Sequence, residues 1–134
     1  MKKLIALLSI MLLVTACTSV SRSASKVGKA QLSISGTQWV LADNIKGKLP
    51  TLRIENGKIS GNAGCNDYFG ELRLTPDSGS FSASKIGATK MFCKNMSVEK
   101  NFLNMLSSAN KYIVSGNSLE LYKDGLLLMK LSKQ

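Results

Sequence analysis

The chain has 134 residues and a formal net charge of +10, so it is long enough for one domain and leaves little room for a second. It contains no histidine, which excludes His-based acid–base catalysis, Ser-His and Cys-His nucleophile pairs and His-containing zinc sites. We therefore expect no catalytic residues, no metal site and no cofactor.

The N-terminal residues, MKKLIALLSIMLLVTAC, have the layout of a bacterial secretory signal, with lysines, an apolar stretch and small residues before a cysteine. The apolar stretch is about thirteen residues long, whereas a stable helix across a bilayer needs roughly 20. Residues 14–17, VTAC, resemble the lipobox of bacterial lipoproteins, in which the cysteine receives diacylglycerol and becomes the new N-terminus. We predict a signal peptide over residues 1–16 and lipidation of Cys17; ordinary cleavage nearby is the alternative.

Residues 17–31 are rich in Ser and Lys and too polar to pack a core, so we expect the lipidated cysteine to be followed by a flexible tether. Thr18 follows Cys17, whereas Asp at this position resembles an inner-membrane retention signal in enteric-type bacteria. We therefore expect anchoring in the cell envelope, in the outer membrane facing the periplasm.

The positive charge would suggest nucleic acid as the partner of a cytosolic protein, but export removes that partner from reach. The lysines are scattered along the chain, which indicates a solvated surface. Binding to anionic lipid or to lipopolysaccharide phosphates is the lesser alternative. The expected partners are thus the membrane, through the lipid on Cys17, and an unidentified envelope protein or lipid.

The folded domain is expected over residues 32–134, and much of it has the patterns of short strands. Trp39 and Leu41 share one face of a candidate strand, and residues 51–55, TLRIE, alternate between apolar and polar. Asn56-Gly57 is a strong two-residue hairpin signal before the return strand KIS. Further strand-like runs, divided by turn residues, are YFGELRLTP, SFSASKIG and three within KYIVSGNSLELYKDGLLLMKL.

One apolar stripe predicts a single amphipathic helix, with Asn95 or Ser97 capping its start and Glu99 in its first turn, where a carboxylate suits the helix dipole. The stripe consists of Val98, Phe102, Met105, Leu106 and Ala109. Together the patterns predict a mostly β (α+β) fold: a curled antiparallel sheet, or a small barrel-like sheet of short strands, with one packed amphipathic helix. They do not decide between an open sheet and a closed barrel.

Two stretches resemble the signatures of the META/HslJ family of heat-inducible bacterial envelope lipoproteins: residues 59–70, ISGNAGCNDYFG, and residues 88–93, ATKMFC. The matching motif residues are Gly64, Cys65, Asn66, Tyr68, Gly70, Thr89, Met91 and Cys93. The similarity covers nearly the whole of residues 32–134. It implies a compact β-rich domain with a helix, often carried on a lipoprotein and linked with heat or envelope stress and with tolerance to novobiocin-type antibiotics.

Cys65 and Cys93 are the cysteines that remain once Cys17 is lipidated, and an even pair in an oxidising compartment indicates a disulfide. A redox-active pair is the alternative, although no CxxC spacing supports it. Asn66 and Asp67, in the same Gly-framed loop, either bind a ligand or satisfy the backbone groups of their own turn. The second role is commoner for such residues.

The remaining acidic and methionine residues suggest no site. The acidic residues lie mostly in turns or alternate with apolar residues, so we expect them to face solvent: Asp43, Glu55, Asp67, Glu71, Asp77, Glu99, Asp124 and Glu120. The methionines outside the signal segment are expected to fill the core: Met91, Met96, Met105 and Met129.

We therefore predict a non-enzymatic bacterial envelope lipoprotein that supports envelope integrity, the stress response or antibiotic tolerance through protein or lipid contacts. The alternative is a periplasmic module that binds a small apolar ligand, which would favour a cavity lined by Trp39, Tyr68 or Phe69. An enzyme is the least favoured function, because the sequence presents no recognisable catalytic set.

Overall fold

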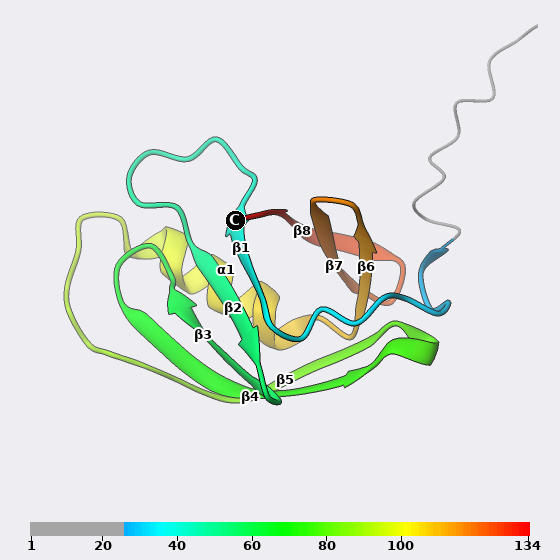
Figure 1. The fold of residues 1–134 in the computed structure, drawn as a ribbon. Coiled ribbons are helices and arrows are strands. Elements are labelled where there is room, and N and C mark those ends of the chain that lie inside the picture. The colour runs from blue at the N-terminus through cyan, green and yellow to red at the C-terminus, as the bar shows by residue number, and fades with distance from the viewer. Residues whose placement is uncertain (1–25) are drawn as a thin grey trace, which may run out of the picture.

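The computed structural model describes residues 26–134, which form a small antiparallel barrel with one α-helix (Figure 1). The eight strands pair in chain order and β8 returns to pair with β1, so the sheet closes on itself. The elements are β1 Thr37–Leu41, β2 Thr51–Glu55, β3 Lys58–Asn62, β4 Asp67–Thr75, the 3-10 helix η2 Pro76–Ser78, β5 Ser80–Ala88, α1 Met96–Ser108, β6 Lys111–Ser115, β7 Ser118–Lys123 and β8 Leu126–Lys133. The predicted mostly β fold with one helix is confirmed, and the sheet has the barrel-like form.

The hairpin between β2 and β3 shows how local sequence directs the sheet. Asn56 and Gly57 adopt φ angles of 49° and 72°, the positive values that a tight two-residue turn requires. The resulting register turns Leu52 and Ile54 into the barrel, each 1% exposed, while Arg53 between them faces outward. The hairpin predicted from Asn56-Gly57 is confirmed.

The barrel is closed unevenly around its circumference. β1 and β8 share three residue pairs, among them Leu41 with Leu131, whereas β5 and β6 share only Ser80 with Lys111. Helix α1 connects β5 to β6 and packs beside β5 (Figure 1). The helix therefore covers the side of the barrel where neighbouring strands are joined by the fewest pairs.

Helix α1 packs on the barrel through the predicted stripe. Phe102 and Leu106 are 1% and 0% exposed, and Val98 and Met105 are half-buried at the edges of the stripe. Ala109, the last stripe residue, is buried at the C-terminal cap, where its N–H donates to the Met105 carbonyl. The predicted helix is confirmed.

The start of the helix differs in detail from the prediction. Asn95 occupies the N-cap position, but its side chain makes no hydrogen bond to the helix backbone. Its Oδ1 instead accepts from the Ser97 hydroxyl at 2.6 Å. The expected side-chain cap is therefore wrong for both residues, because the two side chains satisfy each other rather than the first-turn N–H groups.

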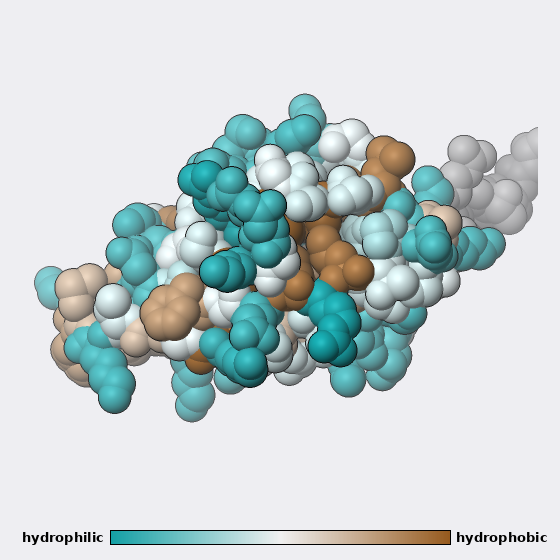
Figure 2. Space-filling view, turned by 60° about the horizontal axis from the view of Figure 1, so that its bottom comes forward, coloured by the Kyte–Doolittle hydropathy of each residue, from teal (hydrophilic) through white to brown (hydrophobic). Residues whose placement is uncertain are grey.

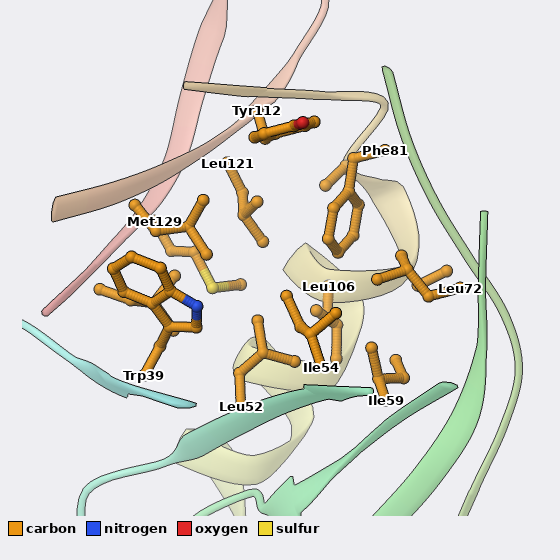
Figure 3. Close-up of a cluster of buried hydrophobic side chains, with 14 of the residues drawn as sticks. Trp39, Leu52, Ile54, Ile59, Leu72, Phe81, Leu106, Tyr112, Leu121 and Met129 are labelled. Atoms are coloured by element: carbon orange, nitrogen blue, oxygen red, sulfur yellow. The ribbon is translucent and has the colours of Figure 1, made fainter. Parts of the chain in front are cut away.

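Every strand and the helix contribute to one continuous core inside the barrel. The side chains that point toward one another in Figure 3 are Trp39, Leu52, Ile54, Ile59, Leu72, Phe81, Leu106, Tyr112, Leu121 and Met129. Truncating a buried Leu or Ile of such a core to Ala typically costs about 2–5 kcal/mol of stability. The interior is thus the main source of fold stability.

The segment before β1 lies against the turn between β4 and β5 and against β6. The Gln31 N–H donates to the Pro76 carbonyl at 2.8 Å, and the Gln31 Oε1 accepts from the Val114 N–H at 3.1 Å. The Tyr112 hydroxyl donates to the Leu32 carbonyl at 2.9 Å. Gln31, expected as the last residue of the tether, therefore contacts the barrel directly.

Residues 1–25 include the expected signal peptide, the expected lipidation site Cys17 and most of the expected tether, and they lie outside the described residues. Within residues 26–134 no helix is long and apolar enough to cross a membrane.

The outer surface of the domain is mostly polar. On the face shown in Figure 2, hydrophilic side chains surround several apolar areas. The large apolar side chains that reach the surface are Leu32, Phe69, Met91, Phe92, Leu126 and Leu127. Phe92 is 93% exposed, the largest value among them.

Gly61 in β3 lies so close to β2 that a Cβ atom at this position would clash with the Thr51 carbonyl oxygen. We predict that Gly61→Ala lowers the free energy of unfolding by about 1–3 kcal/mol, because relieving the clash disturbs the strand pairing. Urea unfolding followed by circular dichroism measures the change. Gly125→Ala is the matched control, since nothing lies within 4 Å of its Cβ position. Equal stabilities of the two variants would contradict the prediction.

Candidate functional site

The family-motif residues converge at one end of the barrel. The turn between β3 and β4, the loop between β5 and α1 and the first turn of α1 meet there, and Figure 1 shows the β1–β2 loop at the same end. We call residues 62–68, residues 89–93 and Glu99 the motif cluster. Its polar contacts join three segments that are separate in sequence.

Asn66 lies at the centre of the motif cluster and is 1% exposed. Its Nδ2 donates to the Met91 carbonyl at 3.0 Å and to the Glu99 Oε1 at 3.0 Å. Its Oδ1 accepts from the Met91 N–H at 2.6 Å and from the Thr89 hydroxyl at 2.9 Å. Because these bonds use both amide hydrogens and both acceptor positions, the Asn66 side chain has no capacity left for a ligand.

The sequence left two roles open for Asn66, ligand binding or satisfaction of its own turn. The structure gives its side chain a third role, because its partners Thr89, Met91 and Glu99 all lie outside the turn. The turn itself is held by Asn62, whose Nδ2 donates to the Cys65 carbonyl at 3.2 Å and whose Oδ1 accepts from the Gly64 N–H at 2.9 Å. Sequence reasoning missed Asn62.

Glu99 was expected to face solvent, and that prediction is wrong. The residue is 8% exposed, and its Oε2 accepts from the Asn66 backbone N–H at 2.7 Å in addition to the Asn66 Nδ2 contact. Glu99 precedes Phe102 by three residues and Leu106 by seven, so it shares the buried face of the helix. A buried carboxylate is costly unless it is hydrogen-bonded, and Asn66 supplies both donors.

Cys65 and Cys93 are joined by a disulfide, with Cα atoms 6.0 Å apart and a sequence separation of 28. The bridge links the β3–β4 turn to the loop before α1, beside the Asn66 contacts with Met91. On the chain-entropy argument a loop of this length is worth roughly 3–4 kcal/mol of stability. The bridge and Asn66 therefore hold the same loop by independent means.

Asp67 lies at the start of β4 and is exposed. Its carboxylate accepts from the Asn62 Nδ2 at 2.8 Å, and its backbone N–H donates to the Thr89 hydroxyl at 3.2 Å. Asp67 therefore contributes to the internal network of the motif cluster rather than to an open site.

The loop between β5 and α1 presents two apolar side chains to solvent. Met91 is 58% exposed and Phe92 is 93% exposed. The expectation that Met91 fills the core is therefore wrong, because the backbone of Met91 is bonded to Asn66 while its side chain faces outward. Met96 and Met105 are half-buried, and Met129 is buried as expected.

Tyr68 anchors the motif cluster to the core. It is 1% exposed, its hydroxyl donates to the Thr51 carbonyl at 2.7 Å, and its ring meets Phe102 edge-on with centroids 5.7 Å apart. Burial raises the pKa of Tyr68 well above its usual value. Gly70 follows in β4, where a Cβ atom would lie 3.0 Å from the Ser84 carbonyl oxygen. Both motif residues thus have packing roles.

The aromatic residues suggested for a ligand cavity do not come together. Trp39 and Tyr68 belong to the packed core, each 1% exposed. Phe69 faces outward from β4, is 63% exposed, and its ring covers Gly87 of β5. A surface hollow of about 730 Å³ lies beside Phe69, at the end of the β2–β3 hairpin opposite the motif cluster. Phe69 is the one of the three residues that lines this hollow.

The motif cluster offers little reactive chemistry. Its two cysteines are bonded to each other, and its carboxylates accept hydrogen bonds from asparagine side chains. Within residues 26–134, no group of three or more acidic or cysteine side chains is placed to hold a metal ion. The arrangement is suited to holding a loop in one conformation.

The described residues thus form a closed eight-stranded antiparallel barrel with one helix, held at one end by a disulfide and a buried asparagine–glutamate contact. The META domain family model matches residues 30–134, and the chain belongs to this family. The resemblance of the two motif stretches to META domain proteins is thereby confirmed.

Solved structures show the same fold. A protein from Burkholderia xenovorans, determined by NMR, is similar with a TM-score of 0.63 and 20% identity, over 84% of this chain and 86% of that one. A DUF4847 family protein from Bacteroides vulgatus ATCC 8482 has a TM-score of 0.55 and 14% identity, over 73% of this chain and 92% of that one. The search of curated proteins gave no match.

We predict that Glu99→Gln lowers the free energy of unfolding by about 1–3 kcal/mol, because an amide at this position places an N–H group against a donor of Asn66. Thermal or urea unfolding at neutral pH measures the loss. Glu71→Gln is the matched control, since Glu71 is an exposed partner of Lys85 and such pairs contribute little. A Glu99→Gln variant as stable as the control would contradict the assigned contact.

Tyr68 gives the domain a predicted sensitivity to alkaline pH. Its pKa is raised in the folded state, so the folded protein keeps the phenol proton to higher pH than the unfolded chain does. The contribution of Tyr68 to the free energy of unfolding is therefore fully present below about pH 10, the pKa of tyrosine in the unfolded chain. Above that pH the free energy of unfolding falls, by up to about 1.4 kcal/mol per pH unit for one tyrosine. Burial also raises the pKa of Tyr112, and burial with the Glu120 hydrogen bond raises that of Tyr122 to about 12.

Urea unfolding of the wild type and of Tyr68→Phe between pH 9 and about 11 tests this account. The variant loses about 1 kcal/mol at neutral pH with the Thr51 hydrogen bond, and its stability then falls less steeply with pH. Parallel pH profiles for the two proteins would show that Tyr68 does not carry the effect.

Proposed function

We propose that this META domain protein is a bacterial envelope lipoprotein, exported by its N-terminal segment and acylated on Cys17, that works by contact and not by catalysis. The layout of residues 1–17 supports export and acylation, because the apolar stretch ends in a lipobox-like VTAC. The Cys65–Cys93 disulfide is consistent with an oxidising compartment.

The observation that supports a contact function is that the polar groups of the motif cluster bind one another. Asn66 and Glu99 form hydrogen bonds with each other, and Asn66 also binds the loop that contains Thr89 and Met91. The outcome is a loop with a fixed backbone and exposed apolar side chains, of which Phe92 is 93% exposed. Exposed apolar side chains of this kind commonly mark interaction surfaces.

The family resemblance adds the biological setting to the proposal. It implies a role in heat or envelope stress and in tolerance to novobiocin-type antibiotics. Thr18 after Cys17 favours the outer membrane, with the domain facing the periplasm. The domain would then support envelope integrity by binding an envelope protein or lipid while the acyl chains keep it at the membrane.

Cys17→Ala tests the anchor and the role together. We predict that the variant moves from the detergent phase to the aqueous phase, or accumulates uncleaved, because two or three acyl chains are needed for stable attachment. The intact mass of the wild type should correspond to the chain from Cys17 plus acyl groups. In a strain of the source bacterium that lacks the chain, wild type should restore novobiocin tolerance and Cys17→Ala should not.

Thr18→Ala is the control variant, since it changes the neighbouring residue and keeps the acylated thiol. A wild-type mass without acyl groups, or unchanged detergent partitioning of Cys17→Ala, would contradict the anchor. Equal novobiocin tolerance with and without the chain would contradict the proposed role.

A further inference from the structure

The loop between β5 and α1 is rigid in its backbone and apolar at its tip. The Met91 N–H and carbonyl are both bonded to Asn66, and Cys93 is tied to Cys65. Phe92 lies between these two fixed points and is almost completely exposed. A loop that is already ordered loses little conformational freedom when its tip binds, so the bracing favours binding at this place.

Exposed lysines lie on the segments that meet at this end of the barrel. Lys90 and Lys94 flank Met91 and Phe92 in the loop itself, and Lys100 lies in the first turns of α1. The β1–β2 loop lies at the same end of the barrel (Figure 1), and Lys46 and Lys48 are exposed residues of this loop. The Lys48 carbonyl would lie 3.5 Å from a Cβ atom on Gly64, directly beside the disulfide turn.

The charge at this end of the barrel is not balanced locally. Among the ion pairs formed within residues 26–134, none involves these five lysines. Of the nearby carboxylates, Glu99 is buried against Asn66, and Asp67 accepts a hydrogen bond from Asn62. Asp43, in the β1–β2 loop, is the other exposed carboxylate on these segments. The tip therefore presents apolar side chains at an end of the barrel that carries excess positive charge.

We propose that this tip docks on a bilayer surface that contains anionic phospholipid, with Phe92 and Met91 entering the interface and the surrounding lysines contacting lipid phosphates. An aromatic side chain beside lysines is the combination that favours the boundary between acyl chains and headgroups, because lysine stems lie along apolar surface while their charges reach the phosphates. A stable protein interface usually buries more than about 1,000 Å². Two exposed apolar side chains are few for the centre of such an interface, which favours a bilayer as the partner of this tip.

This inference rests on the proposed function, because acylation of Cys17 would keep the domain at a bilayer. The described chain begins near Gly79, at the start of β5, where the Lys29 carbonyl lies close to the turn. The loop between β5 and α1 begins at the other end of β5, about 25–30 Å away for a strand of this length. The first described residues and the loop therefore lie at opposite ends of the domain (Figure 1).

Tryptophan quenching by brominated lipid tests the docking. The mature protein carrying Phe92→Trp is mixed with excess vesicles of phosphatidylcholine brominated on its acyl chains, one third of the lipid being phosphatidylglycerol. The matched control is Phe69→Trp, since Phe69 is also an exposed phenylalanine but lies on the outer face of β4. Trp39 is buried in every variant and provides the common background.

We expect quenching of Phe92→Trp at least about twofold greater than that of Phe69→Trp, because acyl-chain bromine reaches only a side chain that enters the interface. Lys90→Glu and Lys94→Glu are then added to Phe92→Trp. For an unacylated chain these changes should reduce the apparent vesicle affinity by about tenfold or more. For an acylated chain they should reduce the quenching. Lys58→Glu with Lys123→Glu, which changes two exposed lysines at the first residue of β3 and the last residue of β7, should leave the quenching unchanged.

Equal quenching of Phe92→Trp and Phe69→Trp would overturn the docking. Equal quenching of Phe92→Trp in vesicles with and without phosphatidylglycerol would overturn the recognition of anionic lipid. The intact mass of the same sample reports acylation of Cys17 separately. Because the vesicles are in excess and the added tryptophan reports its own position, the loop is tested whether or not the chain is acylated.

Discussion

The contact between Asn66 and Glu99 is the interaction on which the motif end of this domain depends. A carboxylate buried on the barrel-facing side of a helix needs donors, and Asn66 supplies its backbone N–H at 2.7 Å and its side-chain amide at 3.0 Å. The other groups of the same amide hold the loop through Thr89 and Met91. One side chain thereby fixes the positions of a turn, a loop and a helix.

The disulfide and the core act around this contact. Cys65 precedes Asn66 and Cys93 follows the Met91 segment, so the covalent bridge closes the same junction that the hydrogen bonds occupy. Phe102 continues the helix face below Glu99 and meets Tyr68 edge-on. Because α1 also covers the side of the barrel where β5 and β6 share one pair, fixing its first turn supports closure of the sheet.

Local patterns predicted the parts of the fold that depend on neighbouring residues. Asn56-Gly57 predicted its hairpin because the turn requires positive φ, and the stripe from Val98 to Ala109 predicted the helix from its period. Closure of the barrel depends on β1 meeting β8, which are distant in sequence, and no local pattern contains that pairing. The choice between an open sheet and a closed barrel therefore could not be made from the sequence, and the structure shows the closed barrel.

The motif cluster was predicted only in part, for two physical reasons. Its residues were identified by family resemblance, but charge alone placed Glu99 in solvent because the donors that make its burial possible belong to a turn 33 residues away. Spacing from Phe102 was the signal that could have located it. Met91 was predicted to fill the core because methionine side chains commonly do. In the structure Asn66 binds the Met91 backbone, and the Met91 side chain is exposed.

Native-state hydrogen exchange of the Asn66 and Met91 amides is the most direct measurement of the central claim. Both amides donate inside the motif cluster, to Glu99 and to Asn66 respectively, although both belong to connecting segments. If the cluster fixes the loop, both should be protected to nearly the same degree as the amides of β7 and β8, and Asn66→Ala should remove the protection at Met91. Exchange of both amides as fast as that of the exposed Phe92 would contradict the account.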